Sequence, residues 1–449
     1  MKCKPAQNDI LLGKASSVEK VAGEAILRLE TKAKGMAHVQ NSKASHRFQA
    51  FSALRYSNFR WFWLNGATQA MGQGMQFLIL GWLVLEITGS SSRLGLVIFA
   101  FGLPNLTFAM VGGIIADRAS RLKLLISTRL CVSALIFALA ILRITDFLEV
   151  WHVYAVSSLL GTLQALNGPA RMAIVADLVD RNDLMNAITL HGMVNQSGQI
   201  LGPAAAGGII ELVGIGPALI VNAGLYLSGI VFLLLIRALP PRFGSGDATV
   251  LEDLRAGFQC IRSTPILYTV IGMTLAFAFF AVSYRNVMPA FTKEVLEIGA
   301  GGTGLLLLAA GLGSLFGSLI LASLGDFQSK ARLLLASVLF LSLFLTLFAW
   351  SSWFWASWII LLFVGATSFG FFTPLANTLI QLNVPPELRG RVLSVFQLAP
   401  AVHYLGALPL AVAADVISWP VAVTGGAALS LIFALWLGVW RPVLRNLGE

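Results

Sequence analysis

The stretch "GGIIADRASRLKLL" (residues 112–125) interrupts a long apolar segment with four charged residues, Asp117, Arg118, Arg121 and Lys123. The chain becomes apolar again directly after this stretch. A short charged turn between two long apolar segments is typical of helices that leave a lipid bilayer and re-enter it. The stretch therefore predicts a membrane protein.

The composition supports this prediction. The chain has 449 residues, of which 57% are hydrophobic and 12% charged, and its mean hydropathy is +0.80. Soluble domains carry about 25% charged residues, so this chain cannot cover a water-facing surface. We expect an all-α integral membrane protein whose surface faces the lipid bilayer.

Segments of about 20 apolar residues are long enough to cross the bilayer as helices. Charge clusters and Gly, Pro and Ser turns divide the chain into twelve such segments. They cover residues 61–86, 94–116, 122–143, 151–175, 185–212, 215–237, 266–291, 301–325, 331–350, 353–381, 391–416 and 419–440.

The basic residues predict the orientation. Thirteen Lys and Arg lie in or beside the loops after even-numbered segments, against Arg93, Arg143 and Lys293 after odd-numbered ones. Residues 1–60 add eleven basic residues against four acidic ones. Positive charge stays on the cytoplasmic side, so both termini are expected in the cytoplasm of a cell-membrane protein. Topology and anionic lipid explain this charge without a nucleic-acid partner.

These features divide the chain into five parts. The breaker "LPPRFGSGD" opens the longest internal connection, and an amphipathic helix is predicted after it. We expect a basic cytoplasmic tail (1–59), a six-helix half (60–237), a cytoplasmic linker (238–265), a second six-helix half (266–440) and a short cytoplasmic tail (441–449).

The two halves look like copies of one another. Pro169 matches Pro374 at an offset of 205 residues, and Leu184 matches Leu388 at 204. The opening motif is repeated at an offset of 209, where Asp326, Lys330 and Arg332 follow Asp117, Arg121 and Lys123. Phe327 stands where Arg118 stands in the first copy. Two parallel repeats are typical of transporters that rock one half against the other.

At these residues the chain resembles the major facilitator superfamily. Gly113, Asp117, Arg118 and Arg121 match its loop motif between helices 2 and 3, and "GQILGPAAAGG" (198–208) resembles a helix 5 motif of its drug exporters. The runs at 59–91 and 385–396 resemble the branch of macrolide and enterobactin exporters. The resemblance implies a secondary transporter of small molecules, coupled to protons, and we expect it to act as a monomer without a cofactor or metal.

The resemblance also implies roles for the charged loops. The motif residues hold the cytoplasmic side closed and release it as the cavity turns inward. Partners for Asp117 are expected in the other half. The gating set is Gly113, Asp117, Arg118, Arg121, Asp326, Lys330, Arg389 and Arg391.

Polar stripes run along several predicted helices. Residues three or four apart share one face of a helix, and polar groups inside the bilayer face protein or water. By analogy with the family, helices 1, 4, 7 and 10 line a central cavity, whereas hydrogen bonding between helices is the alternative role. The predicted lining is Asn65, Gln69, Gln73, Gln76, Gln164, Asn167, Arg171, Arg285, Thr373, Asn377 and Gln381.

Arg285 stands out because an unpaired guanidinium inside a span costs about 2.5 kcal/mol or more. It either recognises an acidic or polar substrate, or it forms a structural ion pair or extends toward the outer lipid headgroups. Arg129, within the third predicted helix, poses the same choice and favours the structural role. Proton coupling rests mainly on the resemblance, with Glu86, His191 and His403 as candidate titrating groups.

Small residues mark places where helices can approach closely. Gly198, Gly202, Pro203 and Gly207 form the helix 5 packing motif. The same helix carries the exporter resemblance, so this motif favours export over import. The alternatives are a nutrient importer of the same fold, or a receptor or lipid-handling protein without transport. No catalytic or metal-binding pattern occurs among the five histidines and three cysteines, so we do not expect an enzyme.

The altered second copy of the motif predicts an asymmetric gate. Because Phe327 replaces the arginine, Asp117→Asn should abolish transport while the protein still inserts into the membrane, and Asp326→Asn should reduce transport less. Transport and membrane insertion of the two variants can be measured side by side. Equal loss in both variants would contradict an asymmetric gate.

Overall fold

The computed structural model describes residues 51–118, 120–237, 250–325, 329–385 and 388–439. Residues 53–449 form one compact unit, and its described part contains helices and turns without a strand. Most of the predicted N-terminal tail, the first part of the linker, Asp326 and the C-terminal tail lie outside the described residues. The prediction of an all-α protein is confirmed for the described part.

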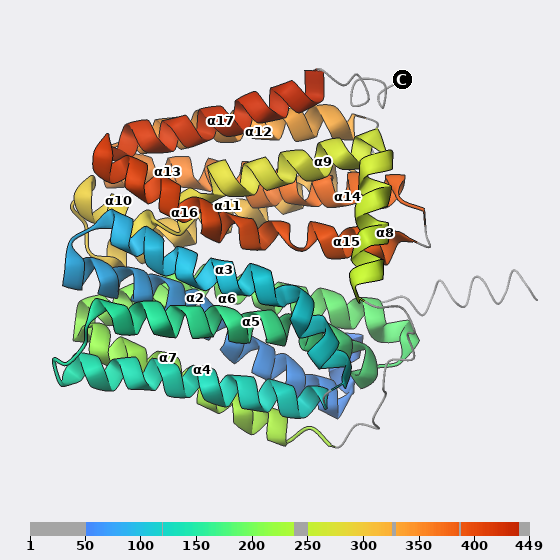
Figure 1. Cartoon of the computed structure of the whole chain (residues 1–449), viewed down its shortest axis with the longest axis horizontal. Helices are drawn as coiled ribbons and strands as arrows, with labels where there is room; N and C mark the ends of the chain where they lie inside the picture. The colour runs from blue at the N-terminus through green and yellow to red at the C-terminus, as the bar shows by residue number, and fades with distance from the viewer. Residues whose placement is uncertain (1–50, 119, 238–249, 326–328, 386–387, 440–449) are drawn as a thin grey trace, which may run out of the picture. The chain divides into compact units, whose positions relative to one another are not determined.

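The first group of helices runs from residue 52 to residue 234. It lies on one side in Figure 1, in blue through green. Its elements are η1 (Ser52–Arg55), α2 (Ser57–Thr88), α3 (Ser91–Arg118), α4 (Arg121–Ile144), α5 (Val150–Leu178), η2 (Arg181–Asp183), α6 (Leu184–Val213) and α7 (Ile215–Leu234).

The second group runs from residue 265 to residue 439, in yellow through red in Figure 1. Its elements are α9 (Pro265–Ala276), η3 (Phe277–Ala281), η4 (Val282–Arg285), α10 (Met288–Glu294), α11 (Ala300–Ser323), α12 (Lys330–Ala349), α13 (Phe354–Gly365), η5 (Ala366–Phe372), α14 (Thr373–Asn383), α15 (Arg389–Phe396), α16 (Ala399–Val416) and α17 (Trp419–Val439).

A separate helix, α8 (Val250–Ser263), lies in the predicted linker and crosses the ends of the other helices (Figure 1). Its glycine, Gly257, lies close to α15: a Cβ added there would be 2.8 Å from the carbonyl oxygen of Arg391. The predicted linker helix is therefore present, and it packs on the second group.

Nine helical segments of the described chain are long and apolar enough to cross a membrane. Helices also lie at the other predicted segments, with different properties. α5 and α6 are long but carry more polar side chains, among them Gln164, Asn167 and His191. The predicted segment 391–416 is interrupted between α15 and α16, which leaves a shorter apolar helix at its end.

Two segments of the second group depart from regular helix. η3 and η5 are π-helical, and η4 is a 3₁₀ turn that follows η3. Insertions of this kind are rare and frequently lie at functional sites. The two π-helical segments contact each other where Phe277 stacks on Phe372, with ring centroids 3.9 Å apart.

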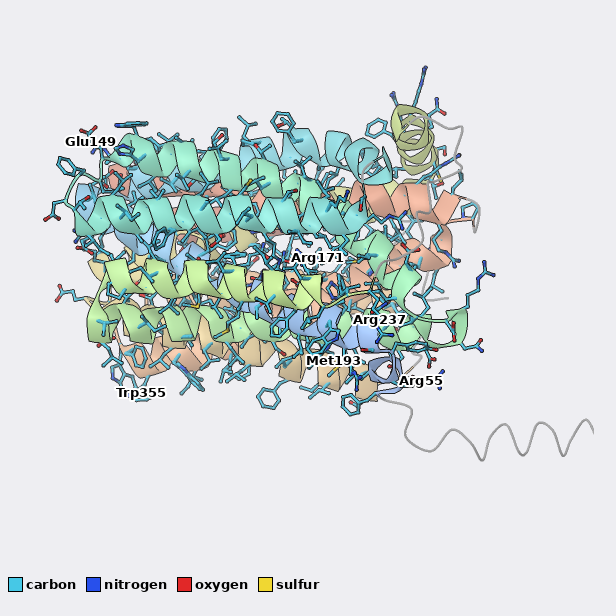
Figure 2. The ribbon with its side chains drawn as sticks, turned by 90° about the horizontal axis from the view of Figure 1, so that it is seen from below. Arg55, Glu149, Arg171, Met193, Arg237 and Trp355 are labelled. Carbon is cyan, nitrogen blue, oxygen red and sulfur yellow. The ribbon has the colours of Figure 1, made fainter. Side chains whose placement is uncertain are left out.

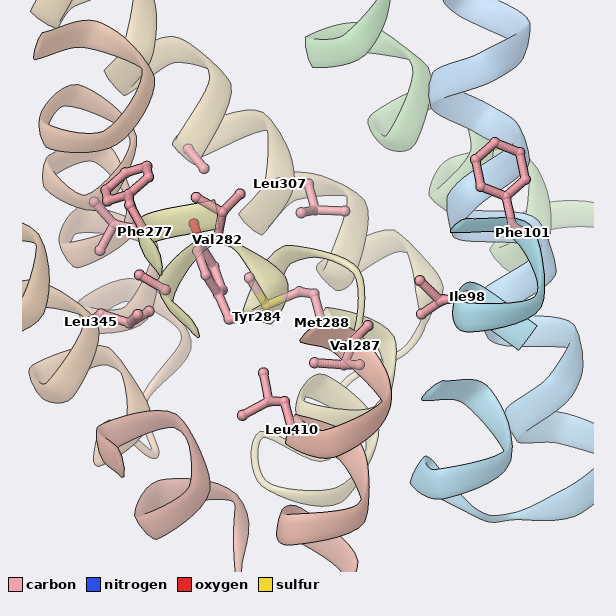
Figure 3. Packing of buried hydrophobic residues seen from close by; sticks show 14 of the residues in the cluster. Ile98, Phe101, Phe277, Val282, Tyr284, Val287, Met288, Leu307, Leu345 and Leu410 are labelled. Carbon is pink, nitrogen blue, oxygen red and sulfur yellow. The ribbon is translucent and has the colours of Figure 1, made fainter. Parts of the chain in front are cut away.

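The two groups meet along two helix pairs, α3 with α16 and α6 with α11. Both contacts depend on glycines. A Cβ on Gly95 would be 2.7 Å from the Cβ of Ala411, and one on Gly207 would be 2.3 Å from the carbonyl oxygen of Ala300. Apolar side chains from both groups complete the packing, and Figure 3 shows Ile98 opposite Met288.

The small residues of the helix 5 motif bring α6 against both neighbours. A Cβ on Gly198 would be 2.3 Å from the Cβ of Ala70, and one on Gly202 would be 2.8 Å from the Cα of Gly74, both on α2. On the other side, the carbonyl oxygen of Pro203 lies 2.6 Å from the Cβ position of Gly304 on α11. The motif thus fixes α6 within the first group and against the second.

Gly198 gives a test of this packing. Gly198→Ala should lower the free energy of unfolding by about 1–3 kcal/mol, because backbone atoms of α2 cannot move away from the added methyl group. Gly192→Ala on the same helix is the matched control, since nothing lies within 4 Å of its Cβ position. Thermal unfolding of the purified protein in detergent measures both. A similar midpoint for the two variants would contradict the packing role of Gly198.

Candidate functional site

A cavity of about 400 Å³ lies between the two helix groups. Pockets for small molecules usually have volumes of a few hundred cubic ångströms or more. Both groups supply polar and aromatic side chains to it. The polar and aromatic lining comprises Gln73, Phe77, Asn105, Gln164, Gln196, Gln199, Arg285, Asn286, Phe369, Gln397, His403 and Tyr404.

Arg285 joins the two groups across this cavity. Its Nη2 donates to the carbonyl oxygen of Gln199 on α6 (3.2 Å), and its guanidinium lies 5.6 Å from the ring centroid of Phe369 on η5. None of the salt bridges found among the described residues involves Arg285. A carbonyl group and an aromatic face therefore stabilise its charge, and the guanidinium can still bind an anionic or polar group in the cavity.

The predicted lining residues fall into three sets. Gln73, Gln164 and Arg285 line the cavity. Gln69, Gln76 and Asn167 line a smaller side pocket inside the first group, which also includes Gln73 and Gln164. The others lie outside both spaces: Asn65, Arg171, Thr373, Asn377 and Gln381.

On α14 the predicted stripe is internally bonded. The Gln381 side chain donates to Asn377 Oδ1 (2.9 Å), and the Thr373 hydroxyl donates to the carbonyl oxygen of Ser368 (3.4 Å). Phe369, on the π-helical η5 just before α14, supplies the contact to the cavity instead.

Polar contacts across the two groups gather at one end of the bundle, and we call them the latch. Glu294 of the second group accepts hydrogen bonds from the Ser91 hydroxyl (2.5 Å) and from Trp419 Nε1 (2.7 Å). Asp415 accepts from the backbone N–H of Ser92 (2.8 Å) and so caps the start of α3. Lys293, the remaining member, donates to the carbonyl oxygen of Leu85 at the end of α2 (3.0 Å).

Aromatic rings lie between the two groups next to the cavity. Tyr404 stacks on Phe77, with centroids 5.3 Å apart, and meets Phe101 edge-on at 5.1 Å. Gly102 allows this approach, because a Cβ there would be 2.4 Å from the Cβ of Tyr404. The first and second groups are thus in direct contact at the cavity wall.

At the opposite end, the predicted gating residues are described only in part. Asp326 lies outside what the structure describes, and Gly113, Asp117 and Arg118 are described only as backbone of α3. Arg121 forms an ion pair with Asp177 (2.5 Å), which belongs to the same group. The other predicted members lie at the start of α12 and of α15: Lys330, Arg389 and Arg391.

The candidate titrating groups occupy different places. Glu86 forms an ion pair with Arg143 (2.6 Å) at an exposed end of the first group. His191 is buried and stacks on Phe62, with Asn195 hydrogen-bonded to its Nε2 (3.1 Å). His403 lines the cavity beside Tyr404. His403 is therefore the candidate with direct access to a cavity ligand.

Sequence reasoning missed several residues of the site. Asn105 and Tyr404 stand singly in apolar stretches and form no periodic stripe. Glu294, Trp419 and Asp415 meet partners more than 100 positions away, so their local sequence gives no signal. Within the part that the structure describes, no group of His, Cys, Asp and Glu is placed to hold a metal ion.

A bundle of apolar helices with a cavity shared by two helix groups is the architecture of a membrane transporter, and the sequence profile places it in the major facilitator superfamily. The chain belongs to the transmembrane secretion effector family of that superfamily, whose sequence profile matches residues 48–445. The predicted family is thus confirmed, and the protein is a multi-pass membrane protein.

Several relatives of similar sequence are exporters by name. The chain is 26% identical to the multidrug efflux pump Tap of Mycolicibacterium fortuitum, over 85% of this chain and 94% of Tap. It is 26% identical to the enterobactin exporter EntS of Escherichia coli (68% and 73% covered) and 22% identical to macrolide efflux protein A of Streptococcus pyogenes (76% and 86%). The resemblance to the macrolide and enterobactin branch is confirmed.

Solved structures share the fold. A bacterial homologue of the human lysosomal transporter Spinster, in an inward-facing conformation, matches with a TM-score of 0.67 at 12% identity, over 87% of this chain and 96% of that chain. The nucleoside transporter NupG matches with a TM-score of 0.65 at 15% identity, over 87% and 99%. At these identities the likeness concerns the fold alone.

Arg285 gives a test of the cavity. Compounds that carry a carboxylate should raise the thermal unfolding midpoint of the purified protein. Arg285→Ala should weaken their binding by about 10-fold or more, since a hydrogen bond to a charged group contributes about 1.5–3 kcal/mol. Lys293→Ala, which lies outside the cavity lining, is the control. A carboxylate whose stabilising effect survives Arg285→Ala unchanged would remove this arginine from the binding site.

Proposed function

We propose that this protein is a secondary active exporter of small amphipathic molecules that works by alternating access and is driven by protons. The observation that carries this proposal is the cavity between the two helix groups. Because α2, α3, α5 and α6 line one side of it and η4, η5 and α16 line the other, a relative movement of the groups would change its access.

The proposed architecture is twelve spans in two six-helix halves related by an internal repeat. A buried hydrogen bond supports it: the Ser133 hydroxyl donates to the carbonyl oxygen of Ala223 (2.9 Å), and the Ser342 hydroxyl donates to that of Ala427 (3.0 Å). The serines are 209 residues apart and the alanines 204, close to the offsets in the sequence.

Close helix approaches repeat in the same way. Gly202 on α6 lies against α2, and Gly406 on α16 lies against η3, where a Cβ would be 2.0 Å from the carbonyl oxygen of Phe279. These glycines are 204 positions apart. Equivalent helices of the two groups therefore pack through equivalent glycines, as expected for a duplicated unit.

In this proposal, the latch lies on the outer side of the membrane. Arg55 and Arg237 lie at one end of the bundle in Figure 2, and Glu149 and Trp355 lie at the other. The basic end faces the cytoplasm by the positive-inside rule, with both termini there. The structure would then be a state closed to the outside.

The cavity chemistry suits amphipathic molecules. Amides such as Gln73, Gln164 and Gln199 offer both donors and acceptors, and Phe77 and Phe369 offer apolar faces. Such a lining binds ligands of several shapes, which fits the exported molecules named for the relatives. His403 is the proposed proton carrier next to the ligand, with His191 and Glu86 as alternatives.

Transport in vesicles tests the proposed direction. Everted membrane vesicles that contain the protein should accumulate a substrate, such as a macrolide or a catecholate siderophore, when a proton gradient is imposed. Dissipating the gradient should abolish the accumulation. Vesicles with Asp117→Asn, matched for protein amount, are the control.

Accumulation in right-side-out vesicles instead would overturn export and favour an importer of the same fold. Accumulation that persists without the gradient would overturn proton coupling.

A further inference from the structure

A second arginine, Arg129 on α4, is buried away from the central cavity. Only 1% of its surface is exposed. Its Nη2 donates to Gln69 Oε1 (2.5 Å) and to the carbonyl oxygen of Asn65 (3.0 Å), whereas its Nε and Nη1 have no hydrogen-bond partner within the described part of the chain. Gly229 on α7 makes room for the guanidinium, since a Cβ there would be 2.2 Å from Nη1.

A third arginine adds to this charge. Arg171 on α5 is 7% exposed, lies near enough to repel Arg129, and has an unpartnered Nε. Figure 2 shows it among the helices rather than at their ends. Neither arginine belongs to a salt bridge found among the described residues. Two positive charges are therefore buried together without a carboxylate beside them in that part of the chain.

Charge balance requires a negative partner. A guanidinium does not give up its proton in proteins, and a buried charge without a partner costs several kcal/mol. Repulsion between the two arginines adds to this cost. A neutral water can satisfy an N–H group, but it cannot compensate two positive charges.

The side pocket lies where such a partner would fit. Arg129, Gln69, Gln76, Asn167 and Tyr226 line it. The side-chain oxygens of Gln69 and Gln76 already accept hydrogen bonds, from Arg129 and from the Tyr226 hydroxyl (3.0 Å). Their NH₂ groups make no hydrogen bond among the described residues and remain as donors. The pocket thus offers an excess of donors, which is what an anion needs.

The size of the pocket limits the occupant. Its volume is about 20 Å³, which is enough for one small ion or for the end of a carboxylate group. Gln73 and Gln164 line both this pocket and the central cavity, so the two spaces are neighbours.

We propose that this side pocket of the first helix group binds a small monovalent anion, held by Arg129 and balanced by Arg171. The anion is either a free halide or a carboxylate carried by the transported molecule. The second source rests on the proposed export function, whereas the anion site itself does not.

The unfolding midpoint of the purified protein tests the proposal in chloride and formate series, with methanesulfonate, which carries no carboxylate, keeping the ionic strength constant. The midpoint should rise steadily as the small anion is added, because a ligand that binds the folded state stabilises it by RT ln(1 + c/Kd), where c is the free anion concentration. The half-saturating concentration of the site, its Kd, follows from a fit of this rise. In Arg285→Gln protein, which lacks the arginine of the central cavity, Arg129→Gln and Arg171→Gln should each abolish the rise. Arg143→Gln, on α4 but outside the side pocket, should leave it unchanged.

A milder variant keeps the proposal testable if the arginine variants do not fold. Gln76→Met keeps both arginines and a similar volume but removes a donor, and it should raise the half-saturating anion concentration about 10-fold. A lower half-saturating concentration for formate than for chloride assigns the pocket to a carboxylate, and the reverse assigns it to a free halide.

A wild-type midpoint that does not depend on chloride or formate would overturn the proposal. An equal rise in wild-type and Gln76→Met protein would overturn it as well. Loss of export in vesicles with an intact anion effect would instead contradict the proposed function alone.

Discussion

The fold depends on one constraint: a polar group inside a lipid-facing helical bundle must find its partner within the protein or in a water-filled space. The first group satisfies this constraint with hydrogen bonds between its helices. The Asn222 side chain donates to the carbonyl oxygen of Gly72 (2.7 Å), and Ser133 and Tyr226 make similar bonds. These bonds tie α2, α4 and α7 together. Polar atoms without such partners, above all those of Arg129, mark places where a ligand can bind.

The second group meets the same constraint differently, through irregular backbone next to the cavity. η3 and η4 carry the chain to Arg285, and η5 carries Phe369 to the same place. Irregular backbone at membrane depth is tolerated where it is buried in protein or lines a cavity. The two groups thus share a packing scheme, but the first concentrates its polar side chains and the second its irregular helices.

Much of the helix arrangement could be predicted, because hydropathy is a local property of the chain. The ranges predicted near α4 and α12 agree with the structure within a few residues. The interruption before α16 was missed although Gln397 and Pro400 break the apolar run there. The π-helical η3 and η5 could not be predicted, since the sequence around them is largely apolar. Helical spacing selected Gln73 and Gln164, and a charge inside a predicted span selected Arg285; all three line the cavity. Helical spacing also assigned Asn377 to the cavity. Periodicity shows which residues share one face of a helix, but it does not show whether that face contacts the cavity or another helix.

The contacts between the groups differ in kind from those within them. Asp415 caps α3 at an exposed end, where water can replace the carboxylate, and losing such a cap costs about 1 kcal/mol. The bond from Ser342 to Ala427 is buried, and breaking it would leave a hydroxyl and a carbonyl without partners. The Asp415 bond of the latch therefore costs less to break than this bond within the second group. This difference favours movement of each group as a unit, which is what the proposed alternating access requires.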